Sequence, residues 1–120
     1  MKLDYSHVGG GPPRSRRDEL VARLAEGSVT LLDVRPTDEF GRGHLAGARN
    51  VPLAELEAVM AQLDPGIEIV AYCRGPWCVL SFDAVEILRA SGLAVRRLAD
   101  GYPEWKAAGL PVECTLVGAP

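Results

Sequence analysis

The sequence predicts a single α/β domain in which a mostly parallel sheet is covered by helices on both faces. Short apolar segments rich in β-branched residues alternate with segments of helical periodicity along most of the chain. Each helix between two strands returns the chain to the same end of the sheet, which favours parallel pairing. The length of 120 residues, with 48% apolar and 24% charged residues, is typical of one globular domain.

The first half of the chain begins with a helix and a buried strand. Ser15 and Asp18 form a weak capping box before residues 18–27, and Gly27 would end that helix. Residues 29–34, with the sequence VTLLDV, are apolar and β-branched, which indicates a buried strand. The pattern then predicts one helical turn at 37–44 and a short strand within 47–53, which Pro52 ends or confines to a sheet edge.

The second half repeats this alternation. A helix is predicted at 54–63, ended by the Asp64-Pro65-Gly66 turn, and a second buried strand at 67–72. In the next predicted helix, at 79–90, one apolar face consists of Leu80, Ala84, Ile87 and Leu88. The remaining predictions are a strand at 93–98, a short helix at 102–109, and an edge strand or tail at 110–117.

Composition argues against several classes of protein. No apolar run reaches the roughly 18–20 residues of a membrane helix, and the first residues lack the apolar centre of a secretory signal. A net charge of −3 gives no general reason to expect nucleic-acid binding by this domain. Three cysteines without an export signal favour reduced thiols and a cytoplasmic location. The GGGPP segment at 9–13 predicts a flexible N-terminal arm over residues 1–14.

Cys73 is the candidate reactive residue, because it follows the strand at 67–72 and precedes a helix. Binding sites of open α/β sheets lie at the carboxyl ends of strands, and a helix N-terminus favours negative charge. Gly75 permits a tight loop that turns several amides towards one side chain. Arg74 adds a positive charge. These features together predict a stabilised thiolate whose surroundings would accept the outer sulfur of a persulfide or a small anion.

Other interpretations of the cysteines stay open at this point. Cys73 can be a small buried apolar residue, and Cys114 has no evident role. A zinc site needs four ligands, commonly with C-x2-C spacing, whereas the chain has C-x4-C and only His7 and His44. The C-x-x-C of thioredoxin-type motifs is absent. A reversible disulfide between Cys73 and Cys78 would need loop movement to reach bonding geometry.

Three segments of the chain, in this order, resemble the rhodanese domain: LLDVRPTDEFGRGHLAGARNVPL, IVAYCRGPWCVLSFDAVEILRASG and RLADGYPEWKAAGLPVE. Together they contain DVR, GHxxGA, a cysteine loop and GxxxW, a combination that is specific although each part alone is weak. The resemblance covers roughly residues 15–113 and leaves 114–120 as a C-terminal tail. It implies an α/β domain with a central, mainly parallel five-stranded sheet.

The resemblance also implies an activity. Cys73 would take a sulfane sulfur from a donor such as thiosulfate, with sulfite as the leaving group, and pass it from a persulfide to a thiol or to cyanide. Such a thiosulfate sulfurtransferase needs no metal and no organic cofactor. The substrate-binding loop would consist of Arg74, Gly75, Pro76, Trp77, Cys78 and Val79.

Two residues of this loop allow alternatives. Trp77 would flank the pocket mouth, where it either restricts the donor or docks a partner. Cys78 is either a resolving thiol for the Cys73 persulfide or a buried residue of the first helical turn. Two positions depart from the family pattern, since Ala46 stands where proline is frequent and Tyr102 where a second glycine is common. Either change would reshape the pocket rim and alter donor preference.

Other residues near the site are interpreted as structural. Asp33 and Arg35 would brace a loop as an ion pair rather than take part in catalysis. The family counterpart of His44 braces the fold. Trp105 is expected to pack in the core behind the site, and Gly101 to form a backbone turn.

The loop YCRGPWCVLS resembles, more narrowly, rhodanese domains fused behind winged-helix repressors of the arsenic-responsive ArsR class. The chain would then be either a stand-alone relative or the C-terminal part of such a fusion. A sensory module that reads sulfane sulfur or a thiophilic compound, with little turnover, is therefore a second hypothesis. Phosphatase or arsenate reductase chemistry on the same fold uses a C-x5-R loop, and the position of its arginine is Val79 here.

Overall fold

The computed structural model describes residues 13–75 and 78–115. Pro76 and Trp77, two residues of the predicted loop, lie outside the described residues, as do residues 1–12 of the predicted arm. The central sheet has four parallel strands in the order β3-β1-β4-β5. They span Val29–Asp33 (β1), Arg49–Asn50 (β3), Glu68–Tyr72 (β4) and Val95–Arg97 (β5).

The parallel α/β class is confirmed, but the expectation of five strands in one sheet is wrong for the described residues. The two other strands, β2 (His44–Leu45) and β6 (Val112–Glu113), form a separate antiparallel pair. The residue before β6 is held by two hydrogen bonds, because Pro111 O accepts from the Ala46 backbone amide and from the Trp105 side-chain Nε1. The segment at 110–117, predicted to be an edge strand or a tail, thus contains a short strand that joins β2.

Helices occupy most of the predicted positions. They span Pro13–Glu26 (α1), Thr37–Arg42 (α2), Leu56–Val59 (α3), Val79–Ala90 (α4) and Tyr102–Ala107 (α5). Gly27 has a φ of 74° directly after α1, which is the left-handed conformation that ends many helices. No helix in the described part of the chain is long and apolar enough to span a membrane.

The predicted single helix at 54–63 is instead divided into three short pieces. The one turn of α3 lies between 3₁₀ turns at Leu53–Glu55 and Met60–Gln62. Only Leu56 and Leu63 in this segment are fully buried, so packing anchors it at two points instead of along a continuous face. A segment with few buried positions can adopt the tighter 3₁₀ geometry at its ends with little loss of packing.

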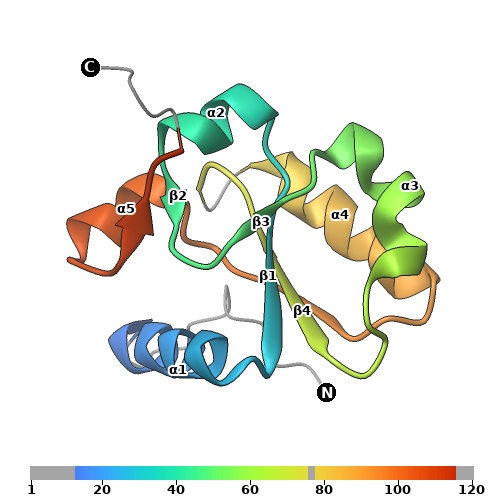
Figure 1. Ribbon diagram of the computed structural model, residues 1–120, viewed down its shortest axis with the longest axis horizontal. Coiled ribbons are helices and arrows are strands. Elements are labelled where there is room, and N and C mark those ends of the chain that lie inside the picture. Colours follow the sequence, from blue (N-terminus) through green and yellow to red (C-terminus); the bar gives the residue numbers. More distant parts are fainter. Residues whose placement is uncertain (1–12, 76–77, 116–120) are drawn as a thin grey trace.

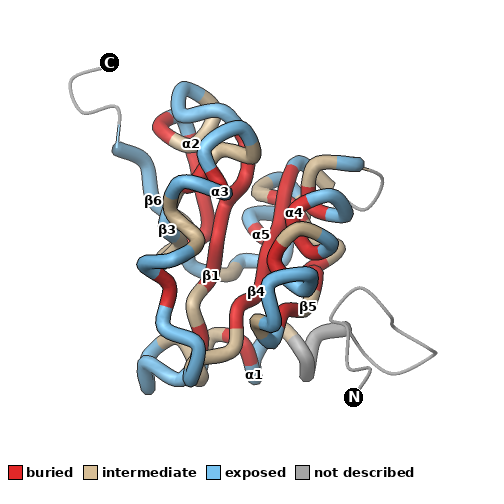
Figure 2. The backbone as a smooth tube through the Cα atoms, turned by 90° about the vertical axis from the view of Figure 1, so that its right-hand side faces the viewer, coloured by how far each residue is buried: buried red, intermediate tan, exposed pale blue. Residues whose placement is uncertain are grey.

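The sheet separates two apolar clusters, because successive side chains of a strand point to opposite faces. Figure 1 shows α1 and α5 on one side of the sheet and α3 and α4 on the other. The cluster under α1 and α5 includes Leu20, Leu31, Val70, Tyr72 and Trp105. The cluster under α3 and α4 includes Leu32, Leu56, Ile69, Ala71, Cys73, Ala84 and Leu88. In Figure 2, β1 and β4 are buried along most of their length.

Helix α4 buries a face slightly different from the predicted one. Its fully buried residues are Ser81, Ala84, Val85 and Leu88, and the predicted Leu80 and Ile87 pack partly buried beside them. The buried Ser81 is satisfied on both sides, since its hydroxyl donates to Cys78 O and accepts a hydrogen bond from Arg97 Nε of β5. This polar link fixes the first turn of α4 against the sheet.

Candidate active site

The direction of the Cys73 side chain follows from the alternation of β4. Ile69 and Ala71 point to the α4 side of the sheet, and Cys73, two residues further on, points the same way. Cys73 is only 1% exposed. Cys78 is the residue directly before the first turn of α4 and is half-buried. The thiol position of Cys73 therefore lies against the N-terminus of a 12-residue helix, where negative charge is favoured.

Cys73 and Cys78 are joined by a disulfide bond in the structure. Their Cα atoms are 6.1 Å apart, which lies within the ordinary range of about 4.4–6.8 Å for bridged cysteines. The Cys78 amide donates to Gly75 O at 3.3 Å, which turns the loop back towards the end of β4. This conformation is the bonded one, so whether the loop has to move when the disulfide forms stays a prediction.

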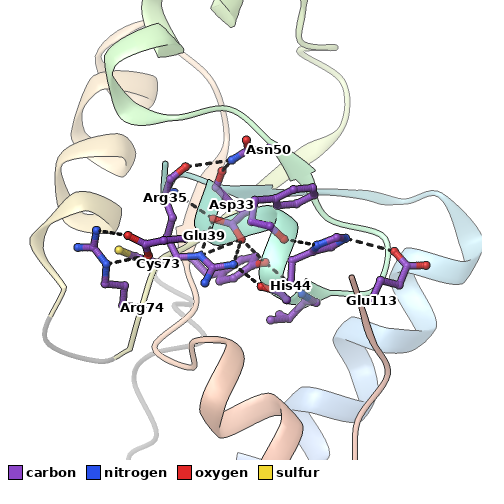
Figure 3. A network of polar contacts seen from close by, with 12 residues as sticks. Asp33, Arg35, Glu39, His44, Asn50, Cys73, Arg74 and Glu113 are labelled. Carbon is purple, nitrogen blue, oxygen red and sulfur yellow. Dashed lines mark hydrogen bonds and ion pairs between the residues drawn. The ribbon is translucent and has the colours of Figure 1, made fainter. Parts of the chain in front are cut away.

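The Arg74 guanidinium is paired with a carboxylate. Its guanidinium forms two hydrogen bonds to the carboxylate of Glu39 on α2, at 2.9 and 2.7 Å, as Figure 3 shows beside Cys73. The hydrogen bonds from Arg74 lower the pKa of Glu39 below its usual value, and Glu39 in turn raises the pKa of Arg74. The positive charge expected beside Cys73 is thus shared with a carboxylate.

A second carboxylate lies close to the loop. Glu104 caps the N-terminus of α5, where its Oε1 accepts a hydrogen bond from Gly101 N at 2.8 Å. A Cβ placed on Gly75 would lie 3.6 Å from Glu104 Oε2, so this carboxylate is close to the cysteine loop. Two carboxylates, Glu39 and Glu104, therefore lie near the cysteine loop.

Gly101 packs directly against the backbone of the cysteine loop. Its φ of −107° is open to any residue, so the predicted backbone turn does not explain why glycine stands here. A Cβ at Gly101 would lie 2.1 Å from the carbonyl oxygen of Arg74. Glycine therefore lets the start of α5 pack directly on the backbone that follows Cys73.

Asp33 and Arg35 form a buried ion pair at the end of β1, as predicted for this pair. Both side chains are nearly inaccessible, with Asp33 at 0% and Arg35 at 5% exposure. Arg35 also donates to Gly43 O at 2.7 Å, and Tyr72 donates its hydroxyl to Asp33 Oδ2 at 2.6 Å. Burial and the neighbouring Asp33 carboxylate raise the pKa of Tyr72, so its phenol stays protonated and remains a donor. These contacts tie β1, β4 and the end of α2 into one network.

His44 lies at the far end of this network (Figure 3). Its ring stacks on Phe40 with centroids 3.6 Å apart, and its Nδ1 donates to Phe40 O at 2.7 Å. Its Nε2 lies 3.5 Å from Glu113 Oε1 on β6. With 2% exposure and these partners, His44 joins α2, β2 and β6.

An apolar cavity of about 510 Å³ flanks the site. Its lining includes Val34, Pro36, Pro52, Leu53 and Leu80. Val34 and Leu80 also pack in the same apolar cluster as Cys73 and Cys78. The cavity thus shares two residues with the cluster that holds the cysteine pair, although its described lining includes neither cysteine, and it has the apolar lining expected where the body of a small molecule binds.

The comparison with protein families identifies the fold. The family model of the rhodanese-like domain matches residues 16–108, which is most of the chain. The chain belongs to the rhodanese-like domain family. A solved rhodanese-like domain of the Alr3790 protein from Anabaena sp. has a TM-score of 0.71 and 31% sequence identity, covering 86% of this chain and 80% of that one. This likeness confirms the rhodanese-like α/β fold.

Relatives of this rhodanese-like domain include a regulator and an enzyme. The HTH-type transcriptional regulator Rv0324 of Mycobacterium tuberculosis is 53% identical over 97 residues, which cover 81% of this chain but only 43% of the regulator. The thiosulfate:glutathione sulfurtransferase of Homo sapiens is 28% identical over 108 residues, covering 79% of this chain and 94% of the enzyme. The chain thus spans less than half the length of the regulator, and its family includes sulfurtransferases.

The rhodanese-like fold brings together most of the predicted site residues that the structure describes. Cys73, Arg74, Gly75 and Cys78 lie in one loop, with Asp33 and Arg35 at the end of the neighbouring strand. Val79 lies in the first turn of α4, where its side chain is 64% exposed, so only its backbone is available to a cradle around Cys73. Trp105 is 1% exposed and packs in the cluster on the opposite face of the sheet.

The roles of three residues around the site were not predicted from the sequence. Glu39 contacts the loop through Arg74, Glu104 lies beside Gly75, and Tyr72 binds Asp33. Glu39 and Arg74 are 35 positions apart, and Tyr72 and Asp33 are 39 apart. No local pattern marks such pairs. For Tyr72 a weak signal existed, because a tyrosine among apolar strand residues carries a hydroxyl that needs a partner when it is buried.

Proposed function

We propose that this domain is a sulfurtransferase that moves sulfane sulfur from a donor such as thiosulfate to a thiophilic acceptor through a Cys73 persulfide. The observation that carries the proposal is the position of Cys73, at the carboxyl end of β4 and against the N-terminus of α4. Membership in a family that includes sulfurtransferases supports it. The acceptor would be a thiol or cyanide.

The first requirement of this reaction is a free Cys73 thiol. A dithiol reductant has to open the Cys73–Cys78 bond by thiol–disulfide exchange, which releases both thiols. A reducing compartment such as the cytoplasm would supply that reductant. Negative charge on Cys73 would then be stabilised by the unpaired amides and the dipole at the start of α4.

The transfer itself has two displacements. The Cys73 thiolate attacks the outer sulfur of thiosulfate, the sulfur–sulfur bond of the donor breaks, and sulfite leaves with the electron pair. The acceptor thiolate then attacks the outer sulfur of the Cys73 persulfide, takes that sulfur and restores the Cys73 thiolate. Backbone amides of the loop and of the first turn of α4, including Val79, would stabilise the developing negative charge.

Sulfite release in a single turnover tests the proposal. The protein is reduced with dithiothreitol, freed of reductant by gel filtration and mixed with thiosulfate, and sulfite is then quantified. We expect about one sulfite per chain for the wild type and for Cys114→Ser, whose thiol is exposed and remote from the loop in sequence. Cys73→Ser should release none. Equal sulfite from Cys73→Ser and the wild type would exclude Cys73 as the nucleophile.

A sensory role is the second candidate. The observation that favours it is the 53% identity to a transcriptional regulator of which this chain matches only 43%. In such a protein the sulfur-modified or disulfide state of the cysteines would be the signal, and slow turnover would be sufficient. Steady-state rates with cyanide as acceptor separate the two candidates, because rapid thiocyanate formation supports an enzyme and a long-lived modified protein supports a sensor.

A further inference from the structure

We propose that Cys78 is an internal acceptor that converts the sulfur on Cys73 to sulfide. In this reaction the Cys78 thiolate attacks the inner sulfur of the Cys73 persulfide, and hydrosulfide leaves as the Cys73–Cys78 disulfide forms. The inference rests on the proposed function for the persulfide itself. It adds a second activity, reduction of sulfane sulfur to sulfide, in which the two thiols supply the electrons.

The secondary structure places the two sulfurs together. Cys73 is held by β4, whose alternation turns its side chain towards α4, and Cys78 is held at the N-terminus of α4. Ser81 fixes the Cys78 backbone through its hydrogen bond to Cys78 O, and Arg97 fixes Ser81 from the sheet. Both ends of the loop are thus anchored in buried structure, and β4 and α4 hold the two cysteines at bonding distance in this structure.

Burial determines which sulfur of the persulfide each acceptor can reach. The inner sulfur is Cys73 Sγ, and Cys73 is 1% exposed, so an external thiol meets the outer sulfur first. Cys78 contacts Cys73 Sγ itself, because these two atoms are bonded in the structure. The third cysteine, Cys114, is exposed and its thiol donates a hydrogen bond to Gly41 O at 3.3 Å. Among the described residues, Cys78 is therefore the thiol placed to attack the inner sulfur.

The step balances without any further reactant. The Cys73 persulfide and the Cys78 thiol give the Cys73–Cys78 disulfide and hydrogen sulfide. One sulfur–sulfur bond forms between the two Sγ atoms, and the bond to the outer sulfur breaks with its electron pair on the leaving hydrosulfide. The outer sulfur is reduced by two electrons, and the two cysteine sulfurs are oxidised. The proton of the Cys78 thiol passes through solvent to the hydrosulfide, and a dithiol later restores both thiols by exchange.

The position of Cys78 also favours ionisation of its thiol to the thiolate. A thiolate directly before a helix lies close to the unpaired amides of the first turn, which stabilise negative charge. In the oxidised state neither cysteine can act as a nucleophile. In the proposed reaction the disulfide is the product of one cycle of sulfide release. A dithiol has to reduce it before the next cycle can start.

The test compares four reduced proteins after gel filtration and addition of thiosulfate: wild type, Cys78→Ser, Cys73→Ser and Cys114→Ser. Sulfite, sulfide and intact mass are measured on each sample. We expect the wild type and Cys114→Ser to release sulfite and sulfide in equal amounts and to lose two hydrogens. Cys78→Ser should release sulfite but no sulfide, and it should gain one sulfur atom. Cys73→Ser should release neither sulfite nor sulfide, and its mass should not change.

The outcomes separate this inference from the proposed function. Wild-type protein that releases sulfite but keeps the sulfur as a persulfide overturns the inference and leaves the proposed function intact. Sulfide release by Cys78→Ser at the wild-type level also overturns it. Absence of sulfite from the wild type and Cys78→Ser removes the proposed function and the inference together. Sulfite release by Cys78→Ser shows in the same experiment that this variant is folded.

Discussion

Asp33 is the residue on which the buried polar contacts of this domain converge. Its carboxylate accepts hydrogen bonds from the Arg35 guanidinium and from the Tyr72 hydroxyl, and none of these residues is more than 5% exposed. A buried charge is tolerated only when it is paired and fully hydrogen-bonded. All buried side-chain nitrogen and oxygen atoms of the described residues have a partner. The network therefore holds the ends of β1 and β4 in register beside the cysteine loop.

Removal of the Tyr72 hydroxyl tests this network. Tyr72→Phe leaves Leu45 N without the hydroxyl that accepts its hydrogen bond at 3.1 Å, and it removes one donor from Asp33. We expect a loss of about 1–3 kcal/mol in the free energy of unfolding, measured by urea denaturation. Tyr102→Phe is the matched control, because its ring packs on Gly43 at a half-buried position, and it should change stability by less than about 0.5 kcal/mol. Equal effects of the two changes would contradict a special role for the Tyr72 hydroxyl.

The pair between Arg74 and Glu39 is expected to weaken binding of an anionic donor. In Glu39→Gln the Arg74 charge is no longer shared with a carboxylate, and the KM for thiosulfate should fall about two- to fivefold, as for an exposed charge pair. Asp38→Asn is the control, because Asp38 forms an exposed pair with Arg42 at 3.7 Å. The advantage of Glu39→Gln should shrink as salt is added. An unchanged KM would mean that Arg74 does not contact the donor.

The same pair has a predictable pH dependence. The pKa of Glu39 is lowered by Arg74, so its contribution to stability is fully present above the ordinary carboxyl pKa of 4.5. It is lost as the pH falls through the lower pKa of the folded state. At neutral pH the pair is intact, so under the proposed function an anionic donor would compete with Glu39 for Arg74.

At the scale of elements, the site depends on how closely α5 approaches the loop after β4. Gly101 begins α5 and lies against the Arg74 carbonyl, while Glu104 of the same helix lies beside Gly75. Helix α4 carries Cys78 from the other side. Thus β4 positions Cys73, the proposed nucleophile, α4 positions Cys78, and the start of α5 packs against the loop between them.

A methyl group at Gly101 tests the contact between α5 and the loop. The Cβ in Gly101→Ala would overlap the Arg74 carbonyl, so either α5 or the cysteine loop has to move. We expect a loss of about 1–3 kcal/mol in unfolding free energy and a slower release of sulfite from thiosulfate. In the control Gly66→Ala, the new Cβ meets only the carboxylate of the exposed Asp64 at 3.3 Å. Wild-type stability and rate in Gly101→Ala would show that the contact is dispensable.

At the scale of the whole molecule, one sheet supports two apolar clusters. Leu20 of α1 packs on one face and Leu88 of α4 on the other, and both are 0% exposed. Because β1 and β4 contribute side chains to both clusters, neither cluster can lose its packing without disturbing the strands of the other. The domain should therefore unfold as one cooperative unit.

Two substitutions test this coupling. Leu20→Ala and Leu88→Ala should each cost about 2–5 kcal/mol through lost burial and a residual cavity. In both variants, circular dichroism and calorimetry should report one shared transition at a lower temperature than in the wild type. Two separate transitions in either variant would show that the two faces of the sheet unfold independently.

The local features of this protein were predictable from the order of its residues. Hydrophobic periodicity predicted the positions of β1, β4 and α4, and it placed Cys73 at the junction between a strand and a helix. These features depend on residues close together in the chain, so a linear pattern can report them. The motifs of the cysteine loop and its surroundings also predicted the rhodanese-like family.

The tertiary structure alone decided the contacts that define the site. The pairing of Glu39 with Arg74, the approach of Gly101 to the Arg74 carbonyl and the bond between Tyr72 and Asp33 join residues of separate elements. The same holds for the pairing of β2 with β6, which removed a strand from the expected sheet. Such contacts depend on how helices and strands pack in three dimensions, and the packing of one element is set by all its neighbours rather than by its own sequence.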